Sequence, residues 1–474
     1  MSGDPLLSLG LVELAEAIAR GDISSERVTR HCLERMDRIG PRLNCSVAID
    51  AEAALEAARD GDLRRARGER LGPLGGVPMA HKDIFYRAGR ACAGGSKIRR
   101  DFVPDHTATV LSRLESAGAL NLGRLVMSEF ALSPTGYNEH YGHCRNPWHI
   151  DHCSGGSSSG SGASVAARLV YGSLGTDSGG SIRHPAAMCG VTGLKPTYGR
   201  VSRTGVMPLA WSLDCVGPIA QNARDCARLL ALVAGSDASD GHTSAIAVPD
   251  YEAALSGDIR GLRIGVPRGY YYELVTPEVK RALDESLAVL RERGAIIVST
   301  ELPDMGLINA MMHLLLAVEA ATLHRRWLIE RPQDYADQVR ARIEPGLYYP
   351  ATRYAEALAL RARLTQEYLE VAMADADLLH LPAISIPVPS IVATTEGSPA
   401  DVAQAINAVT HCTRGINYLG LPAISVPAGF SPDGLPIGFQ LVGRPFDEAT
   451  LLRTADAYQR DTDWHRRLPP TALQ

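Results

Sequence analysis

Several features that would place a protein at a membrane or outside the cell are missing from this sequence. Residues 1–22 contain neither a basic segment nor a cleavage site, so we expect no secretory signal peptide. The most apolar later run, Ala310 to Leu323, is interrupted by His313 and Glu319 and is too short to cross a bilayer. We therefore expect no membrane partner.

Disulfide spacing and an excess of positive charge are missing as well. The nine cysteines follow no disulfide framework, which predicts a reduced, cytoplasmic protein. There are 48 basic and 53 acidic residues, giving a net charge of −5, which argues against nucleic acid as a partner. Hydrophobic residues make up 45% and charged residues 21%, as in ordinary globular proteins.

One cluster of potential metal ligands lies between residues 140 and 153. It contains His140, His143, Cys144, His149, His152 and Cys153. Zinc is bound by such side chains, but these spacings match no common zinc motif, and Asn-Pro-Trp interrupts the run. The favoured interpretation is a loop, and we expect neither a metal nor another cofactor.

The apolar periodicity predicts strands that alternate with helices. Residues 11–39 are expected to form two amphipathic helices, 77–80 a strand, and 163–171 a helix that starts after a serine-rich turn. Residues 378–381 and 437–442 are further strand candidates. This alternation indicates an α/β fold, and the absence of a long linker favours one domain over residues 1–474.

Two glycine–serine turns flank a short apolar segment and concentrate the chemistry of the chain. They read GGSSSGSG from Gly155 and DSGGSIR from Asp177. Glycine lets backbone N–H groups approach a reacting atom, and a serine hydroxyl is a nucleophile once a base removes its proton. Neither turn contains a histidine, so that base must come from elsewhere.

The second turn offers the better nucleophile. If Ser181 attacks a carbonyl, the N–H groups around Ser178, Gly179 and Gly180 could hold the resulting oxyanion. Asp177 and Arg183 could pair and brace the loop.

Lys82 is a candidate for the missing base. It follows an apolar strand candidate directly, and burial there would lower its pKa and make the amine neutral. The competing interpretation is a surface lysine paired with Asp83.

Other motifs compete for the two turns. A phosphate-binding P-loop would require Gly-Lys-Ser/Thr, which is not present here. Gly156 to Gly160 matches the G-x-S-x-G elbow of α/β-hydrolases and would make Ser158 the nucleophile. Histidines do follow it, at His380, His411 and His465, but without a supporting motif.

The chain resembles the amidase signature family along almost its whole length. The resemblance is carried by GGVPMAHKD around Lys82, by SGGSSSGS, GTDSGGSIR and CGVTGLKPTYGRVS, by RNPW before them, and by GLPAISVPAGFSPDGLPIGFQLVGRPFDEATLL near the end. It implies a three-layer α/β/α fold with a large mixed central sheet covered by helices on both faces. N-terminal helices would occupy about 1–70, the catalytic core 71–300 and 375–474, and a variable helical region 301–374.

The resemblance also implies a Ser–cisSer–Lys triad. Ser181 would be the acylated nucleophile, Ser157 the bridging serine joined to Gly156 by a cis peptide, and Lys82 the base. The backbone from Ser178 to Ser181 would form the oxyanion hole, and Ser158 would support the site.

The substrate is less well defined by the sequence. Met311, Met312, Trp327, Tyr348 and Tyr349 are candidates to line the pocket. Region 301–374 departs from the tRNA-linked members of the family. We therefore expect a free amidase that hydrolyses small or aryl amides, with carbamates or esters as further substrates. A homodimer is one option, and the sequence leaves the oligomeric state open. Two alternatives remain, the glutaminase subunit of a tRNA-dependent amidotransferase and a non-catalytic binding protein.

Overall fold

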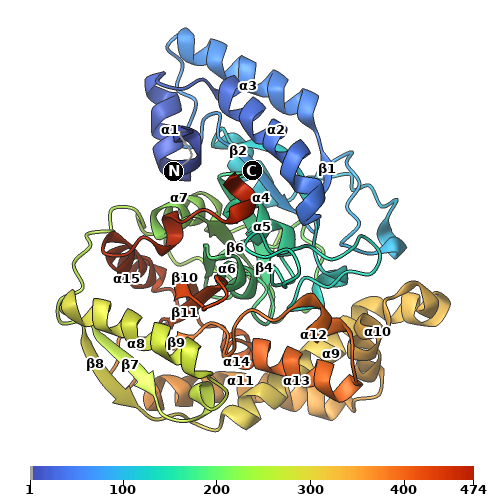
Figure 1. Cartoon of the computed structure of the whole chain (residues 1–474). Coiled ribbons are helices and arrows are strands. Elements are labelled where there is room, and N and C mark those ends of the chain that lie inside the picture. Colours follow the sequence, from blue (N-terminus) through green and yellow to red (C-terminus); the bar gives the residue numbers. More distant parts are fainter. Residues whose placement is uncertain (1–3, 474) are drawn as a thin grey trace.

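A computed structural model describes residues 4–473, which build two β-sheets and the helices around them (Figure 1). The strands are β1 (Ser46–Ile49), β2 (Pro78–Lys82), β3 (Leu120–Leu125), β4 (Gly172–Asp177), β5 (Thr192–Lys195), β6 (Cys215–Ala220), β7 (Arg263–Pro267), β8 (Ile296–Thr300), β9 (Leu378–Pro382), β10 (Ala423–Phe430) and β11 (Pro436–Val442). The α-helices are α1 (Leu11–Arg20), α2 (Ser25–Leu43), α3 (Ala51–Ala66), α4 (Thr109–Ser116), α5 (Ser159–Ala166), α6 (Arg183–Cys189), α7 (Ala223–Val233), α8 (Pro277–Glu292), α9 (Met305–Glu330), α10 (Asp337–Ile343), α11 (Ala351–Val371), α12 (Ile391–Thr395), α13 (Pro399–Thr410), α14 (Arg414–Tyr418) and α15 (Glu448–Arg460).

The large sheet is mixed and has helices on both faces. Its strand order is β4-β6-β5-β10-β11-β9-β7-β8, with β7 parallel to β8 and β9 and the other neighbours antiparallel. Helix α6 packs on one face against β5, β10 and β11, whereas α7, α8 and α15 pack on the other. The predicted three-layer α/β/α class is confirmed.

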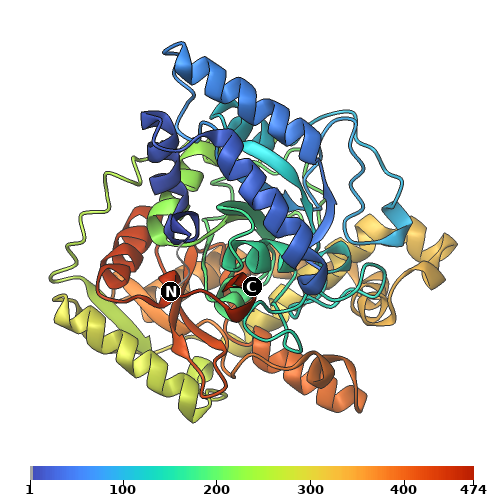
Figure 2. The ribbon, with the colours of Figure 1, turned by 45° about the horizontal axis from the view of Figure 1, so that its top comes forward.

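A smaller sheet joins the N-terminal helices to this core. Its order is β1-β3-β2, and β2 contacts β4 at the edge of the large sheet. Helices α1, α2 and α3 form the upper part of the molecule in Figure 1, and the tilted view brings α2 and α3 to the front (Figure 2). The contact between β2 and β4 matters for function because Lys82 is the last residue of β2.

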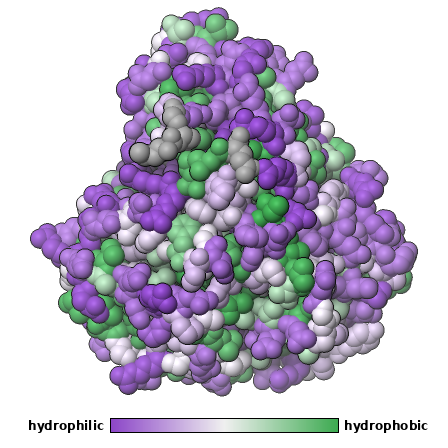
Figure 3. All heavy atoms as spheres, in the orientation of Figure 1, coloured by the Kyte–Doolittle hydropathy of each residue, from purple (hydrophilic) through white to green (hydrophobic). Residues whose placement is uncertain are grey.

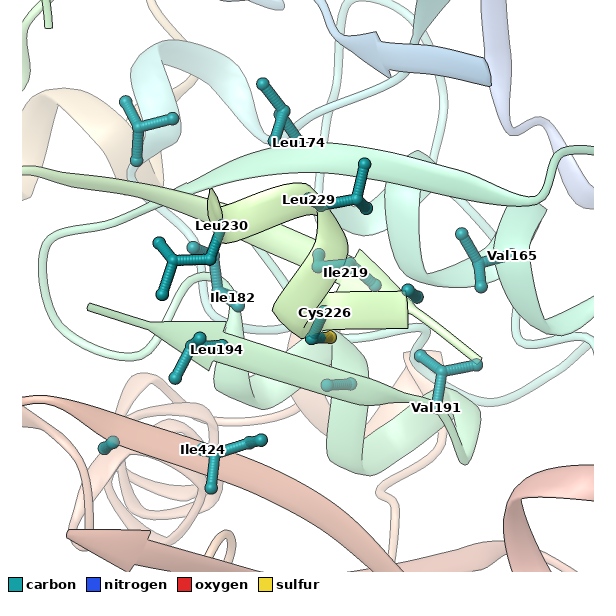
Figure 4. Packing of buried hydrophobic residues seen from close by; sticks show 14 of the residues in the cluster. Val165, Leu174, Ile182, Val191, Leu194, Ile219, Cys226, Leu229, Leu230 and Ile424 are labelled. Atoms are coloured by element: carbon teal, nitrogen blue, oxygen red, sulfur yellow. The ribbon is translucent and has the colours of Figure 1, made fainter. Parts of the chain in front are cut away.

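The core beside the second serine turn depends on glycines. Ile182 is fully buried, and a Cβ atom added at Gly175, Gly193 or Gly217 would lie 3.0 to 3.2 Å from its side-chain atoms. These glycines belong to the adjacent strands β4, β5 and β6. Figure 4 shows Ile182 among side chains of these strands and of α5 and α7. The residue after Ser181 is thereby anchored in the core.

Helix α5 begins earlier than its apolar pattern predicts. It spans Ser159–Ala166, so the first serine turn itself supplies the start of the helix, and residues 167–171 lie outside it. All of its residues are buried, which removes the polar face on which periodicity depends. The expected helix over 163–171 is therefore wrong at both ends.

Helix α9 is longer than its most apolar run suggests. It contains 26 residues. Among the helices of residues 4–473, it is the one whose length and apolar composition would be sufficient to cross a membrane. It nevertheless packs against α11 and α14, and 44% of its most apolar stretch is buried inside the structure. The face shown in Figure 3 is mostly hydrophilic, with hydrophobic residues scattered over it.

Candidate active site

Lys82 lies in the interior, between the two sheets. Its side chain is 1% exposed, and Nζ donates hydrogen bonds to Ser157 Oγ at 2.7 Å and to Thr176 Oγ1 at 2.8 Å. Asp83 instead forms an ion pair with Arg124 at 2.9 Å. The interpretation of Lys82 as a surface lysine paired with Asp83 is therefore wrong.

Burial changes the charge state of Lys82. It lowers the pKa of the amine from 10.5 to about 7, and the charges of Asp214 and Asp177 oppose this shift only in part. A substantial fraction of the amine is therefore neutral at physiological pH and able to accept a proton.

The first serine turn holds its serines in different environments. The peptide bond between Gly156 and Ser157 is cis. The Ser157 hydroxyl accepts the Lys82 hydrogen bond, whereas Ser158 Oγ is fully buried and donates to the Thr176 carbonyl at 3.3 Å. A nucleophile elbow requires an exposed hydroxyl, so the G-x-S-x-G interpretation with Ser158 as nucleophile is wrong.

Of the two serines proposed for the triad, Ser181 lines an open cavity and Ser157 does not. The Ser158 N–H donates to the Ser181 carbonyl at 3.3 Å, which holds the two turns side by side. Ser181 is 9% exposed and lines a cavity of about 380 Å³. Of the five pocket candidates, Met312 and Tyr349 line this cavity; Met311, Trp327 and Tyr348 do not.

Asp177 and Arg183 brace the second turn. Arg183 Nε lies 3.1 Å from Asp177 Oδ2, and both side chains are completely buried. Burial alone would raise the pKa of Asp177, but the charge and hydrogen bonds of Arg183 outweigh it and hold that pKa below its ordinary value. Asp177 also accepts hydrogen bonds from the N–H groups of Gly180 and Ile182, at 2.7 and 3.1 Å.

These bonds correct part of the expected oxyanion hole. The Gly180 N–H is already bound to Asp177, so Gly180 is not available as a donor. Within the described part of the chain, the N–H groups of Ser178, Gly179 and Ser181 have no hydrogen-bond partner. The Ser178 hydroxyl donates to the buried carboxylate of Asp214.

Three residues of the site were missed by sequence reasoning. Thr176 is the second acceptor for Lys82. Thr413 Oγ1 lies 2.7 Å from the Gly179 carbonyl and 2.8 Å from His184 Nε2. His184 lines the cavity, and burial lowers its pKa to about 3, so the ring is neutral. Thr176 and His184 lie beside the motifs, but Thr413 has no local signal.

The histidine- and cysteine-rich segment before the first turn forms loop structure. His140 Nε2 lies 3.0 Å from Glu129, and Cys144 and Cys153 are buried thiols without a shared ligand geometry. Among residues 4–473, there is no group of three or more His, Cys, Asp or Glu side chains placed to hold a metal ion.

Comparison with known proteins places this geometry in a family. Residues 27–452 match the Amidase family. The A subunit of glutamyl-tRNA(Gln) amidotransferase from Roseiflexus castenholzii is 42% identical over 98% of each chain. A structure from a vestigial protein complex linked to the origins of an s-triazine catabolic enzyme has a TM-score of 0.88 and 35% identity, covering 95% of this chain and 98% of the other. Native peptide amidase from Stenotrophomonas maltophilia has a TM-score of 0.84 and 31% identity, covering 98% and 99%.

These comparisons overturn two expectations. A free amidase for small or aryl amides is contradicted because relatives about 40% identical over nearly the full chain are named amidotransferase subunits. The expected partners, a small-molecule substrate without nucleic acid, are contradicted by the same names, and carbamate hydrolysis has no support. The resemblance to the amidase signature is confirmed. The chain belongs to the amidase family and is a hydrolase of carbon–nitrogen bonds.

Proposed function

We propose that this chain is the amide-hydrolysing subunit of an amidotransferase complex and releases ammonia from glutamine for use on a tRNA-bound substrate. The observation that carries the assembly is the 42% identity over 98% of both chains to the A subunit of a glutamyl-tRNA(Gln) amidotransferase. The observation that carries the chemistry is the buried hydrogen bond between Lys82 and Ser157 beside the Ser181 cavity.

The proposed reaction begins with Ser181 as nucleophile. Its Oγ attacks the amide carbonyl carbon, its proton passes to Ser157, and the Ser157 proton passes to the neutral amine of Lys82. The carbon–nitrogen bond then breaks, and the proton returns from Lys82 through Ser157 to the leaving nitrogen, which departs as ammonia. Water attacks the acyl-enzyme through the same relay and releases the carboxylic acid and free Ser181.

Backbone groups stabilise the charge that develops in this reaction. The unpaired N–H groups of Ser178, Gly179 and Ser181 are the proposed donors to the oxyanion. Each such donor is worth about 100-fold to 1,000-fold in rate. Thr413 and the Asp177–Arg183 pair keep the loop in the conformation that presents them.

The partner chain would carry the contacts to tRNA. With a net charge of −5, this chain lacks the excess of lysine and arginine that attracts a phosphate backbone. A division of labour, in which this subunit makes ammonia and another binds tRNA, fits that charge. All nine cysteines are free, which supports a reducing, cytoplasmic location.

Co-purification with neighbouring gene products, followed by glutamine hydrolysis assays, tests this proposal. We expect a second chain to co-purify and to stimulate ammonia release. Ser181→Ala should lower release at least about 1,000-fold, whereas Ser158→Ala should keep it within about 10-fold. A monomer that hydrolyses glutamine unaided by any partner would contradict membership of a complex, and an active Ser181→Ala variant would contradict the nucleophile.

A further inference from the structure

The cavity beside Ser181 has an unbalanced charge. Its wall includes Met312, Leu316 and Ile406 together with two arginines, Arg342 and Arg414. None of the described residues that line it is an aspartate or a glutamate. A cavity of this composition offers apolar contacts and positive charge, but no group that would neutralise a cation.

The two arginines reach the cavity from separate elements. Arg342 lies on α10, and Arg414 is the first residue of α14; both helices pack against α9 (Figure 1). The stem of Arg414 runs beside the second serine turn, because a Cβ atom added at Gly179 would lie 3.8 Å from Arg414 Cγ. Both arginines line the same cavity as the proposed nucleophile, Ser181.

Neutral groups alone bind these guanidinium groups. Arg342 Nη1 donates to the Leu132 carbonyl at 2.6 Å. Arg414 Nη1 lies 3.1 Å from His313 Nε2 and 3.4 Å from Asn407 Oδ1. Within residues 4–473, neither arginine forms an ion pair with a carboxylate. A guanidinium has five N–H donors, so most of the N–H donors of Arg342 and Arg414 have no hydrogen-bond partner in the described part of the chain.

The electrostatics of the cavity favour an anion. Burial, followed by the nearby charge of Arg342, lowers the pKa of Arg414 to about 10, and burial lowers the pKa of Arg342 too. Burial and both arginine charges lower the pKa of His313 to about 4, so this ring is neutral near pH 7. Two half-buried cations thus line one cavity, with an electrostatic effect of Arg342 on Arg414 and no carboxylate in the lining, and an entering carboxylate would stabilise them.

On the basis of the proposed function, we propose that the cavity recognises its amide donor by a carboxylate held between Arg342 and Arg414, and does not recognise an ammonium group. Glutamine would bind the two arginines through its carboxylate, and the cavity would offer no charged partner to its ammonium group. Glutaramate, which has the same amide and a carboxylate but no ammonium, should therefore be at least as good a donor. Pentanamide, which has no carboxylate, should be poor.

Hydrolysis of these three amides by the full chain, with its co-purified partner, tests the proposal. We expect kcat/KM for glutaramate to equal or exceed that for glutamine, and to exceed that for pentanamide at least about 100-fold. Arg342→Met and Arg414→Met should each lower kcat/KM for glutaramate about 10-fold to 100-fold, mainly through KM, because a charged hydrogen bond is lost. Pentanamide hydrolysis should change less than about threefold. Arg414→Lys should recover part of the loss because the charge returns.

Arg340→Met is the matched control. Arg340 lies on the same helix as Arg342, is 38% exposed and does not line the cavity, so its loss should leave all three rates unchanged. Equal hydrolysis of pentanamide and glutaramate, or an equal loss for both in Arg414→Met, would overturn the proposal. Either of these two results would leave the proposed function unchanged. Glutamine hydrolysis that persists in the Ser181→Ala variant would instead refute the proposed function.

Binding of glutarate provides a second measurement that needs no turnover. Calorimetry on the Ser181→Ala protein should detect glutarate binding, and Arg414→Met in that background should weaken it about 10-fold or more. Unchanged melting temperatures establish that the variants fold. A folded Arg414→Met protein that binds glutarate as well as its parent would contradict recognition by the arginine pair.

Discussion

The amine of Lys82 and the hydroxyl of Ser157 are joined by a 2.7 Å hydrogen bond in the interior, although the residues lie 75 positions apart in the chain. Lys82 comes from the end of β2 in the small sheet, and Ser157 from the turn that leads into α5. The contact exists because β2 packs both against α5 and against β4, the edge strand of the large sheet. The same burial lowers the pKa of the amine to about 7, so a substantial fraction of it is neutral near pH 7.

Thr176→Val tests how Lys82 is held. The variant removes one of the two acceptors of the Lys82 amine, and an acceptor favours the charged form, so the pKa of Lys82 should fall further. We expect amide hydrolysis to fall about 10-fold at pH 8 and the acidic limb of the pH–rate profile to move about one unit lower. Thr454→Val, which removes a buried hydroxyl on α15, is the control. An unchanged acidic limb of the pH–rate profile would show that Thr176 does not influence the pKa of Lys82.

Arg183→Met tests the ion pair under the second turn. The variant leaves the buried Asp177 carboxylate uncompensated, and loss of one partner of a buried pair costs about 3 to 5 kcal/mol. Chemical denaturation at pH 7 should show this loss. Because the folded-state pKa of Asp177 lies below its ordinary value, the pair's contribution is present above about pH 4 and is lost as the pH falls further. The difference from wild type should therefore shrink in acid.

Its control is Arg326→Met, which removes an exposed pair with Glu330. We expect a change of no more than about 1 kcal/mol there. Equal effects in the two variants would contradict a special role for the Asp177–Arg183 pair.

Gly217→Ala tests the glycine contacts under Ile182. The added Cβ atom would lie 2.1 Å from the Leu194 carbonyl oxygen on the neighbouring strand, so the backbone must move. We expect the free energy of unfolding to fall by about 1 to 3 kcal/mol or more, measured by denaturant titration.

Gly61→Ala, in the middle of α3, has no atom within 4 Å of the added Cβ. Alanine forms helix better than glycine, so this variant should be more stable by about 0.5 to 1 kcal/mol. Glycine-to-alanine substitution is thus expected to lower the free energy of unfolding at position 217 and to raise it at position 61. A change in the same direction at both positions would rule out the steric argument.

The parts of the site that sequence reasoning could predict are those with a local pattern. The two glycine–serine turns, and a lysine directly after an apolar run, are visible along the chain without any contact information. Strand β2 was predicted because Val77 to Ala80 are apolar. Strands β4 and β6 were missed, since GSLGTD and CVGPIA contain glycine and proline, which are depleted in strands.

The rest of the site depends on contacts between distant segments. Thr413 reaches the Gly179 carbonyl across 234 positions, and no pattern around it indicates this role. The Gly180 N–H was assigned to the oxyanion hole because glycine permits close approach, but the conformation of the turn directs it to Asp177. Arg414 and Arg342 likewise line the same cavity only because α14 and α10 both pack on α9.

The pH dependence of kcat/KM for amide hydrolysis, measured on the wild-type protein with its co-purified partner, tests most directly whether a neutral Lys82 drives the reaction. Only the free-base form can accept the proton, so kcat/KM should rise about 10-fold per pH unit in acid and level off above about pH 7. Lys82→Met should remove both the activity and this limb. A profile that is flat from about pH 5 to about pH 9, or one that keeps rising beyond about pH 10, would contradict the account.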